Sequence, residues 1–202
     1  MTSTYAAPTR AWSIAVLPAL ALALSGCLSF GKDPPDMLLN LTPTTQAAPG
    51  TGASGTSDSA LAILDLQAPQ KLNVTRVPVT TGDSTLAYLK DAEWVEKPAR
   101  LFGRLLADTV RAKGNRLLVS GTDLEFQAAS KLSGTLSAME YDAVSGSAVV
   151  RFDAVLQSGD SQVTTRRFEA VVPGIAAEAE AVGAALNRAA NQVANEVAEW
   201  AG

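Results

Sequence analysis

Side chains able to perform acid–base or nucleophilic chemistry are few in this chain. It holds no histidine and one cysteine among 202 residues. Without histidine, a Ser-His-Asp triad, a Cys-His dyad, a zinc site of the usual ligands and a histidine proton shuttle are all excluded. One cysteine cannot form a disulfide within the chain. The composition therefore argues against most enzyme classes and makes Cys27 the first residue to explain.

Cys27 follows an uncharged apolar run. The polar start of the chain carries one basic side chain, Arg10, and the run Ala11 to Ala23 is shorter than the roughly 20 residues that a membrane-spanning helix needs. Leu24-Ser25-Gly26-Cys27 resembles the bacterial lipobox, in which small residues precede the lipid-accepting cysteine. We predict a lipoprotein signal peptide over residues 1–26 and a diacylglycerol and an N-acyl chain on Cys27, a lasting anchor. An ordinary signal peptide with an incidental cysteine and an uncleaved anchor are the alternatives.

The position after Cys27 predicts the membrane. It is Leu28 and not Asp. By resemblance to the sorting rule of enterobacterial lipoproteins, this places the protein on the periplasmic face of the outer membrane. We expect no cofactor beyond the covalent lipid.

Bulk composition is that of a single folded domain. The chain is 47% hydrophobic and 18% charged, which is enough apolar material for one core. Sixteen basic against twenty acidic residues give a net charge of −4, and loss of Arg10 with the signal peptide makes it −5. No long basic run is present, so nucleic acid is not an expected partner.

Four further side chains are candidates for contact with a partner or a lipid: Trp94, Tyr88, Arg100 and Arg104. Trp94 stands in a polar stretch from Tyr88 to Pro98, and tryptophan is enriched at binding hot spots. The alternative places Trp94 and Tyr88 in the core beside the start of a helix. Arg100 and Arg104 could meet an acidic partner or a lipid phosphate, or form a solvated helix face.

Catalytic groupings are weak. Asp91, Glu93 and Glu96 form an acidic cluster, and paired carboxylates can do acid–base work. No nucleophile or metal-ligand set accompanies them. Ser130-Lys131 and Ser120-Gly121-Thr122 look like turn chemistry. We therefore expect no enzyme and no metal site, with an envelope hydrolase of the Ser–Lys kind as an alternative for a Ser→Ala scan to test.

The N-terminal half of the mature chain begins with a tether. Met37 to Leu41 is a short apolar run that predicts a strand, and Thr42 to Ser59 is a low-complexity flexible segment. This segment is either a loop between that strand and the domain or part of the tether. We favour the loop, because the Leu side chains of the strand need a place to be buried. The predicted division is signal peptide 1–26, lipidated tether 27–59 and periplasmic domain 60–202.

The predicted fold is α/β of the α+β type, a mainly antiparallel sheet packed by two helices. Pro98 begins the first helix, Leu101 to Val110 carry its apolar stripe, and Lys113-Gly114 ends it. The second runs from about Ile175 to Trp200 with a narrow stripe, which either packs on the sheet or meets a coiled-coil partner. Four strands are predicted at Leu61–Leu66, Val74–Val79, Thr85–Leu89 and Leu117–Val119, and Pro78 suggests a strand end or edge. Three further strands should form an antiparallel meander with tight turns. Their alternating faces are Leu132, Gly134, Leu136 and Ala138 in the first, Ala148 to Leu156 in the second, and Phe168, Ala170 and Val172 in the third.

The order of these motifs resembles one family. It comprises the lipobox, Leu39-Asn40-Leu41-Thr42-Pro43, Arg76-Val77-Pro78, Leu86-Ala87-Tyr88, Glu93-Trp94-Val95-Glu96-Lys97-Pro98 and the strand Arg166 to Pro173 before an Ala-rich helix. Together these resemble the ABC-type transport auxiliary lipoproteins, the PqiC-like family, over about residues 27 to 200. The long Thr/Gly/Ser segment after Pro43 departs from that pattern.

The resemblance implies an accessory role in lipid transport across the envelope. Members of such systems pair an inner-membrane ABC transporter with a periplasmic MCE-domain protein that moves phospholipid, and the lipoprotein docks that assembly at the outer membrane. It would not hydrolyse ATP, in keeping with the lack of a Walker-type loop in the sequence. The alternative is a scaffold lipoprotein for outer-membrane protein or lipopolysaccharide assembly.

Overall fold

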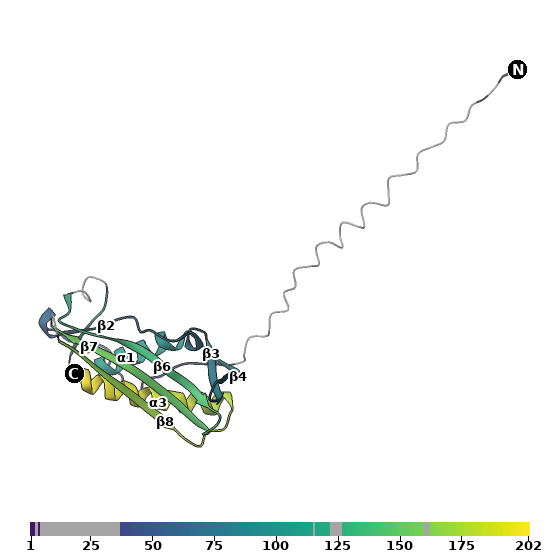
Figure 1. Ribbon diagram of the computed structural model, residues 1–202. Helices are drawn as coiled ribbons and strands as arrows, with labels where there is room; N and C mark the ends of the chain where they lie inside the picture. Colours follow the sequence, from purple (N-terminus) through teal and green to yellow (C-terminus); the bar gives the residue numbers. More distant parts are fainter. Residues whose placement is uncertain (3, 5–36, 115, 122–126, 160–161) are drawn as a thin grey trace. The chain divides into compact units, whose positions relative to one another are not determined.

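The computed structural model describes residues 1, 2, 4, 37–114, 116–121, 127–159 and 162–202. Cys27, its lipobox and the signal peptide lie outside these residues, so their prediction is carried by sequence alone. The compact unit runs from Pro35 to Gly202, and so takes in the segment that precedes residue 60. Within it the architecture is α+β, as predicted: a sheet with a layer of two helices on one face (Figure 1).

The sheet is built on a three-stranded antiparallel meander. β6 (Ser130–Asp142), β7 (Ser147–Ser158) and β8 (Gln162–Val172) pair along almost their whole lengths. Their alternating pattern buries one face, as period-two sequences do. Phe152 of β7 and Phe168 of β8 stand opposite each other on that face and are buried. The predicted meander is confirmed.

The edge of β6 that does not pair with β7 has parallel partners. The alternation of apolar and polar residues does not predict this pairing. β2 (Ala60–Ile63) pairs with the start of β6 and β3 (Arg76–Gly82) with its end. β5 (Leu117–Val119) joins β2 in parallel, and β4 (Thr85–Trp94) returns antiparallel to β3. β1 (Leu38–Leu39) completes the edge in parallel with β4. The early strand is thus confirmed, in the strand order β1-β4-β3-β6-β2-β5.

A bulge in β6 overturns one predicted face. Leu136 pairs with Phe152, but Ala138 pairs with Arg151, so Ser137 is an extra residue on the bulged strand. One inserted residue reverses which side chains point to which face. Ala138 therefore leaves the face of Leu132 and Leu136, and Met139 takes its place in the core. Pro78 likewise lies at a register shift between β3 and β4, not at an edge.

The first helix follows its sequence signals closely. α1 spans Pro98–Lys113, with Pro98 in the first turn. Gly114 ends it in the left-handed conformation, with φ of 67°, where a residue without Cβ is preferred. The whole predicted stripe is buried. It comprises Leu101, Phe102, Leu105, Leu106 and Val110.

The second helix begins later than predicted. α3 spans Ala179–Ala201, whereas the sequence predicts a start at about Ile175. Ile175 is held outside the helix, because its amide donates to the Gly146 carbonyl and its carbonyl accepts from the Tyr141 hydroxyl, at 2.9 and 2.8 Å. Gly174, with φ of 73°, turns the chain just before it. The helix packs on its own sheet and on α1, as Figure 1 shows.

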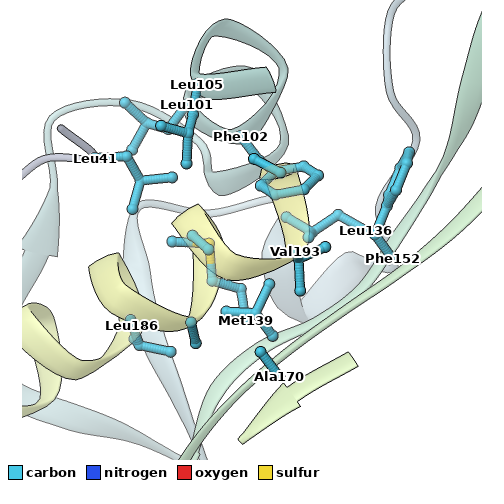
Figure 2. Packing of buried hydrophobic residues seen from close by; sticks show 14 of the residues in the cluster. Leu41, Leu101, Phe102, Leu105, Leu136, Met139, Phe152, Ala170, Leu186 and Val193 are labelled. Carbon is cyan, nitrogen blue, oxygen red and sulfur yellow. The ribbon is translucent and has the colours of Figure 1, made fainter. Parts of the chain in front are cut away.

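Both helices run in the same direction across the sheet. Lys113 at the end of α1 forms an ion pair with Glu199 at the end of α3, at 3.0 Å. Near the start of α3, Leu39 of β1 lies against Gly183. The buried face of α3 is wider than one stripe because α1 covers one flank and the strands the other. Figure 2 shows the resulting core, with Leu41 reaching the helix layer beside Leu101 and Leu105.

The low-complexity segment is joined to α3 by hydrogen bonds. The amides of Thr42 and Thr44 donate to the side-chain oxygens of Asn187 and Asn191, at 2.9 and 2.8 Å. The Asn191 amide donates back to the Thr42 carbonyl at 3.0 Å. The chain then continues to a short 3₁₀ turn, Ser57–Ser59, that leads into β2. This segment therefore starts as a loop fastened along the helix layer.

Candidate functional site

Trp94 lies in the core and not on a binding surface. β4 continues through Trp94, so the stretch from Tyr88 to Pro98 is mostly strand and not the predicted polar loop. The sequence hides this because Asp91, with φ of 54°, sits in a register irregularity that sets polar residues outward. Trp94 is 1% exposed and pairs with Leu39 of β1. This burial removes Trp94 from the candidate contact residues.

Trp94→Phe should therefore act on stability alone. The smaller ring leaves a void, which costs on the order of 1–2 kcal/mol. The indole N–H is buried without a hydrogen-bond partner in the described structure, so losing it offsets part of that cost. Urea unfolding should show a loss of about 1 kcal/mol or less. A variant of unchanged stability that fails to bind its partner would restore the docking hypothesis.

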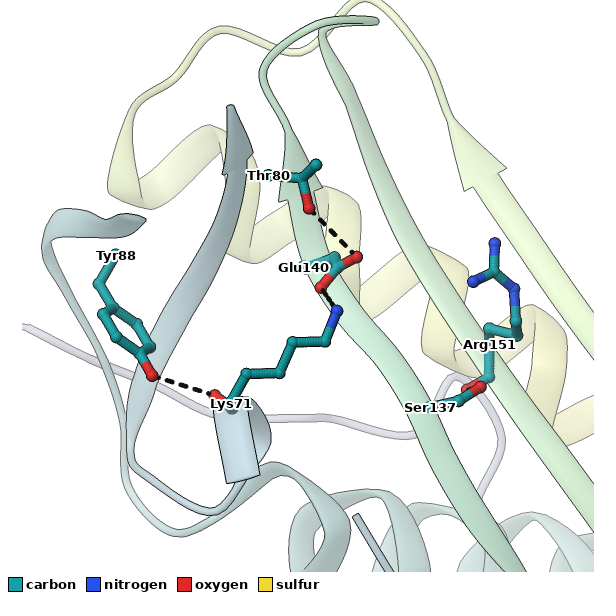
Figure 3. Close-up of polar contacts among 6 residues, drawn as sticks. All are labelled: Lys71, Thr80, Tyr88, Ser137, Glu140 and Arg151. Carbon is teal, nitrogen blue, oxygen red and sulfur yellow. Dashed lines mark hydrogen bonds and ion pairs between the residues drawn. The ribbon is translucent and has the colours of Figure 1, made fainter. Parts of the chain in front are cut away.

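Tyr88 belongs to a polar network on the outer face of the sheet, the face without helices. The Arg76 guanidinium lies 3.9 Å from the centroid of its ring, a favourable stacking arrangement. The Tyr88 hydroxyl donates to the Lys71 carbonyl at 3.5 Å. Lys71 forms an ion pair with Glu140, which also accepts from the Thr80 hydroxyl (Figure 3). These contacts join the 3₁₀ turn Gln70–Leu72 to β3, β4 and β6.

Paired charges continue this outer face across β7 and β8. Arg151 forms an ion pair with Glu169, and Arg167 with Asp153, each across neighbouring strands. The Ser137 hydroxyl at the bulge donates to the Arg151 carbonyl at 3.3 Å. Facing pairs of opposite charge stabilise a sheet modestly and keep its open face soluble. The predicted wet face, with Arg151, Arg167 and Glu169, is confirmed.

Asp153 should make stability depend on acid pH. The hydrogen bond from Arg167, at 2.5 Å, holds the pKa of Asp153 below its ordinary 3.8. A lowered carboxyl pKa contributes stability above the unfolded pKa, and this is lost as pH falls through the folded value. Asp153→Asn should therefore lose less stability than wild type when unfolding is compared at pH 7 and below pH 4. Glu180→Gln, at an exposed position, should lose as much stability as wild type over the same pH change. If wild type and both variants lose the same amount, the stabilising pair of Asp153 with Arg167 is contradicted.

Arg100 and Arg104 do come together, on the side of α1 that faces residues 63–67. Arg104 is engaged by Glu96, at 2.8 Å. Arg100 is exposed and forms no ion pair among the described residues. Both line a shallow groove of about 820 Å³ between α1 and residues 63–67. Trp94 and Tyr88 contribute nothing to this groove, so the four predicted contact residues do not form one site.

The acidic cluster does not converge on a reacting centre. Asp91 lies 3.5 Å from Lys90, Glu96 is paired with Arg104, and Glu93 lies beside β1. No three potential ligand side chains gather for a metal ion in the described part of the chain. Ser130 and Lys131 are successive residues of β6, so their side chains point to opposite faces of the sheet. This geometry gives no support to Ser–Lys chemistry.

A larger hollow lies at the other end of α1, and sequence reasoning missed it. It measures about 1200 Å³. One wall is the C-terminal end of α1 with β5, and the other is the low-complexity segment, including residues 51–54. Arg116 braces the floor by donating to the carbonyls of Ser59 and Ala201, at 3.3 and 3.2 Å. The available signal was the row Asn187, Asn191 and Asn195, polar residues spaced one turn apart along an Ala-rich helix.

Residues 52–55 leave their backbone groups unused at this hollow. They belong to no helix or strand, and their amides and carbonyls make no backbone hydrogen bond to the rest of the described chain. Their side chains are small and exposed. The hollow is thus a polar-edged surface site with free donors and acceptors.

No helix among the described residues has both the length and the apolar character to cross a bilayer.

Comparison with known proteins adds a family and a fold. A family model described as the ABC-type transport auxiliary lipoprotein component matches residues 39–198. A crystal structure of a Xanthomonas campestris protein of the DUF330 family model is similar with a TM-score of 0.69, at 19% identity, over 81% of this chain and 93% of that one. An uncharacterised protein of known structure gives 0.61 at 13% identity, over 72% and 93%. No curated protein matches.

Proposed function

This chain belongs to the family of ABC-type transport auxiliary lipoprotein components, and we propose that it serves as the non-catalytic outer-membrane subunit of an envelope lipid-transport system. In this proposal an inner-membrane ABC transporter and a periplasmic MCE-domain protein move phospholipid. The lipoprotein docks the periplasmic assembly at its destination. It supplies binding energy and position, and no chemical step.

The observation that carries this proposal is the extent of the family match. Residues 39–198 run from β1 to the last turns of α3, which is nearly the whole compact unit. The assignment therefore concerns the entire domain and its architecture. The dispersed carboxylates and the opposed Ser130 and Lys131 add support for a role without catalysis.

Membrane attachment is proposed through Cys27. The lipobox Leu24 to Cys27 supplies the modified thiol, and Leu28 favours the outer membrane. Two or more acyl chains make such attachment effectively permanent. The periplasmic face of the outer membrane is then where the folded unit works.

We assign partner docking to the hollow beyond the C-terminal end of α1. The chain enters the unit at β1, next to the start of α1, and the hollow lies at the far end of this 16-residue helix, about 24 Å away. A subunit held at β1 presents that far end to an assembly arriving from the inner membrane. The free backbone groups of residues 52–55 suit an extended partner segment, because such segments bind through main-chain hydrogen bonds.

Affinity purification of the tagged full chain from native membranes tests this function. We expect an MCE-domain protein and its ATPase, both lost in Cys27→Ala. Gly52 lines the hollow, and a Cβ there meets nothing within 4 Å, so Gly52→Trp adds a bulky ring at this wall and should abolish recovery. Ala184→Trp, at an exposed position of α3, is the matched control and should retain it. Recovery of a β-barrel assembly or lipopolysaccharide-insertion component instead would replace the transport role with the scaffold role.

A further inference from the structure

Exposed apolar side chains gather where the chain enters the folded unit. Met37, Leu38 and Val95 are 56%, 54% and 43% exposed. Leu38 pairs with Glu93 of β4, and the Val95 amide donates to the Leu39 carbonyl at 2.9 Å, so the three are neighbours. Single exposed apolar residues are ordinary on protein surfaces, but a group of them marks a contact. We call these three residues the entry patch.

Two cations follow Val95 in the sequence, by two and five positions. Lys97 and Arg100 are exposed at the start of α1 and form no ion pair among the described residues. Cations at the beginning of a helix are disfavoured by the helix dipole, so their own helix does not stabilise them. Of the nearby carboxylates, Glu96 is taken up by Arg104, while Glu93 borders Leu38. The charge of Lys97 and Arg100 is therefore available to an external anion.

The length of the connecting chain limits how far this surface can lie from the membrane. Cys27 precedes Met37 by ten positions, which at full extension reach about 35 Å at most. A surface held that close to a bilayer meets it at high effective concentration, so weak contacts become populated. Apolar side chains flanked by long cations form the pattern of a membrane-interface contact, with the apolar groups at the acyl boundary and the cations at the phosphates.

We infer that the entry patch, with Lys97 and Arg100, rests against the phospholipid surface to which the chain is anchored. This inference rests on the proposed lipidation of Cys27. This contact would give the folded unit a defined orientation relative to the membrane. The hollow, about 24 Å away along α1, then stays clear of the bilayer and open to the periplasmic partner.

Environment-sensitive labels on the full lipidated chain test this orientation. Once Cys27 is lipidated, an introduced cysteine is the one free thiol. We would place an NBD fluorophore on Leu38→Cys and Val95→Cys, and on the exposed controls Val163→Cys and Val171→Cys of β8. In vesicles of phosphatidylethanolamine and phosphatidylglycerol, we expect severalfold brighter and blue-shifted emission at positions 38 and 95 and water-like emission at 163 and 171. Lys97→Glu with Arg100→Glu should weaken the change.

Flotation of the unlabelled chain with the vesicles separates the two claims. A chain that fails to float refutes the anchor, and with it both proposals. A chain that floats while all four labels report water keeps the anchor and overturns the orientation. If emission at positions 38 and 95 rises with protein density in the vesicle and not with lipid contact, a second copy covers the entry patch and the inference is wrong.

Discussion

Gly134→Ala is expected to lower the free energy of unfolding by about 3 kcal/mol or more, since overpacking at an interior position that cannot relax is costly. Gly134 lies in β6 opposite Ala154, and its carbonyl accepts from the Gln67 amide at 2.9 Å. A Cβ at this position would stand 2.3 Å from the Asp153 carbonyl oxygen and 2.7 Å from the Phe152 ring. A strand backbone cannot yield by that distance without losing its pairing.

The Phe152 ring explains why a glycine is needed there. It covers Gly134 and packs against Phe102 of α1, with ring centroids 5.2 Å apart. The glycine thus lets an aromatic residue of the neighbouring strand reach the helix layer, an arrangement known to compensate for glycine in a sheet. Its loss would disturb both the β6–β7 pairing and the seat of α1.

Urea unfolding of residues 28–202 measures the effect, with Gly103→Ala as the matched control. Gly103 lies within α1, and a Cβ there would meet Leu66 at an ordinary 3.7 Å. Alanine is favoured over glycine inside a helix by up to about 1 kcal/mol, so this variant should be more stable than wild type. A Gly134→Ala protein as stable as wild type would show that the clash at Gly134 has been misjudged.

Asn191→Ala is expected to cost about 2 kcal/mol and to release the low-complexity segment from α3. Asn191 is buried, accepts from the Thr44 amide, and donates to the carbonyls of Thr42 and Asn187. Each such hydrogen bond contributes on the order of 1 kcal/mol, and the better helix propensity of alanine returns a few tenths. The segment it holds forms one wall of the hollow.

Limited proteolysis and denaturant unfolding together report this release. Residues 42–59 contain no Lys or Arg, so elastase, which accepts small residues, is the suitable protease. We expect cleavage in this segment to accelerate severalfold in Asn191→Ala, and recovery of the MCE-domain partner to fall with it. Gln192→Ala, an exposed neighbour on α3, should behave as wild type. An uncut segment in a destabilised Asn191→Ala protein would mean that other contacts hold the wall.

The sequence alone determined the parts of this protein whose signals are local. Pro98, the apolar stripe and Gly114 define α1 because initiation, burial and termination of a helix are each decided within a turn or two. Period-two alternation with tight turns defines the β6–β7–β8 meander for the same reason. The proposed lipobox at Cys27 rests in the same way on four successive residues and stays a prediction. The order of short motifs along the chain indicated the family that the match over residues 39–198 bears out.

Only the tertiary structure decided the features that depend on residues far apart. The bulge at Ser137 and the irregularity at Asp91 change which side chains point inward, and no local pattern announces a one-residue insertion. Trp94 is buried because β1, more than fifty residues earlier in the chain, pairs with β4. Contact between distant segments also produces the parallel strand pairs and the hollow, one wall of which is held by Asn187 and Asn191. Pairing and packing between distant segments are selected by the free energy of the whole core, and local propensity does not carry that information.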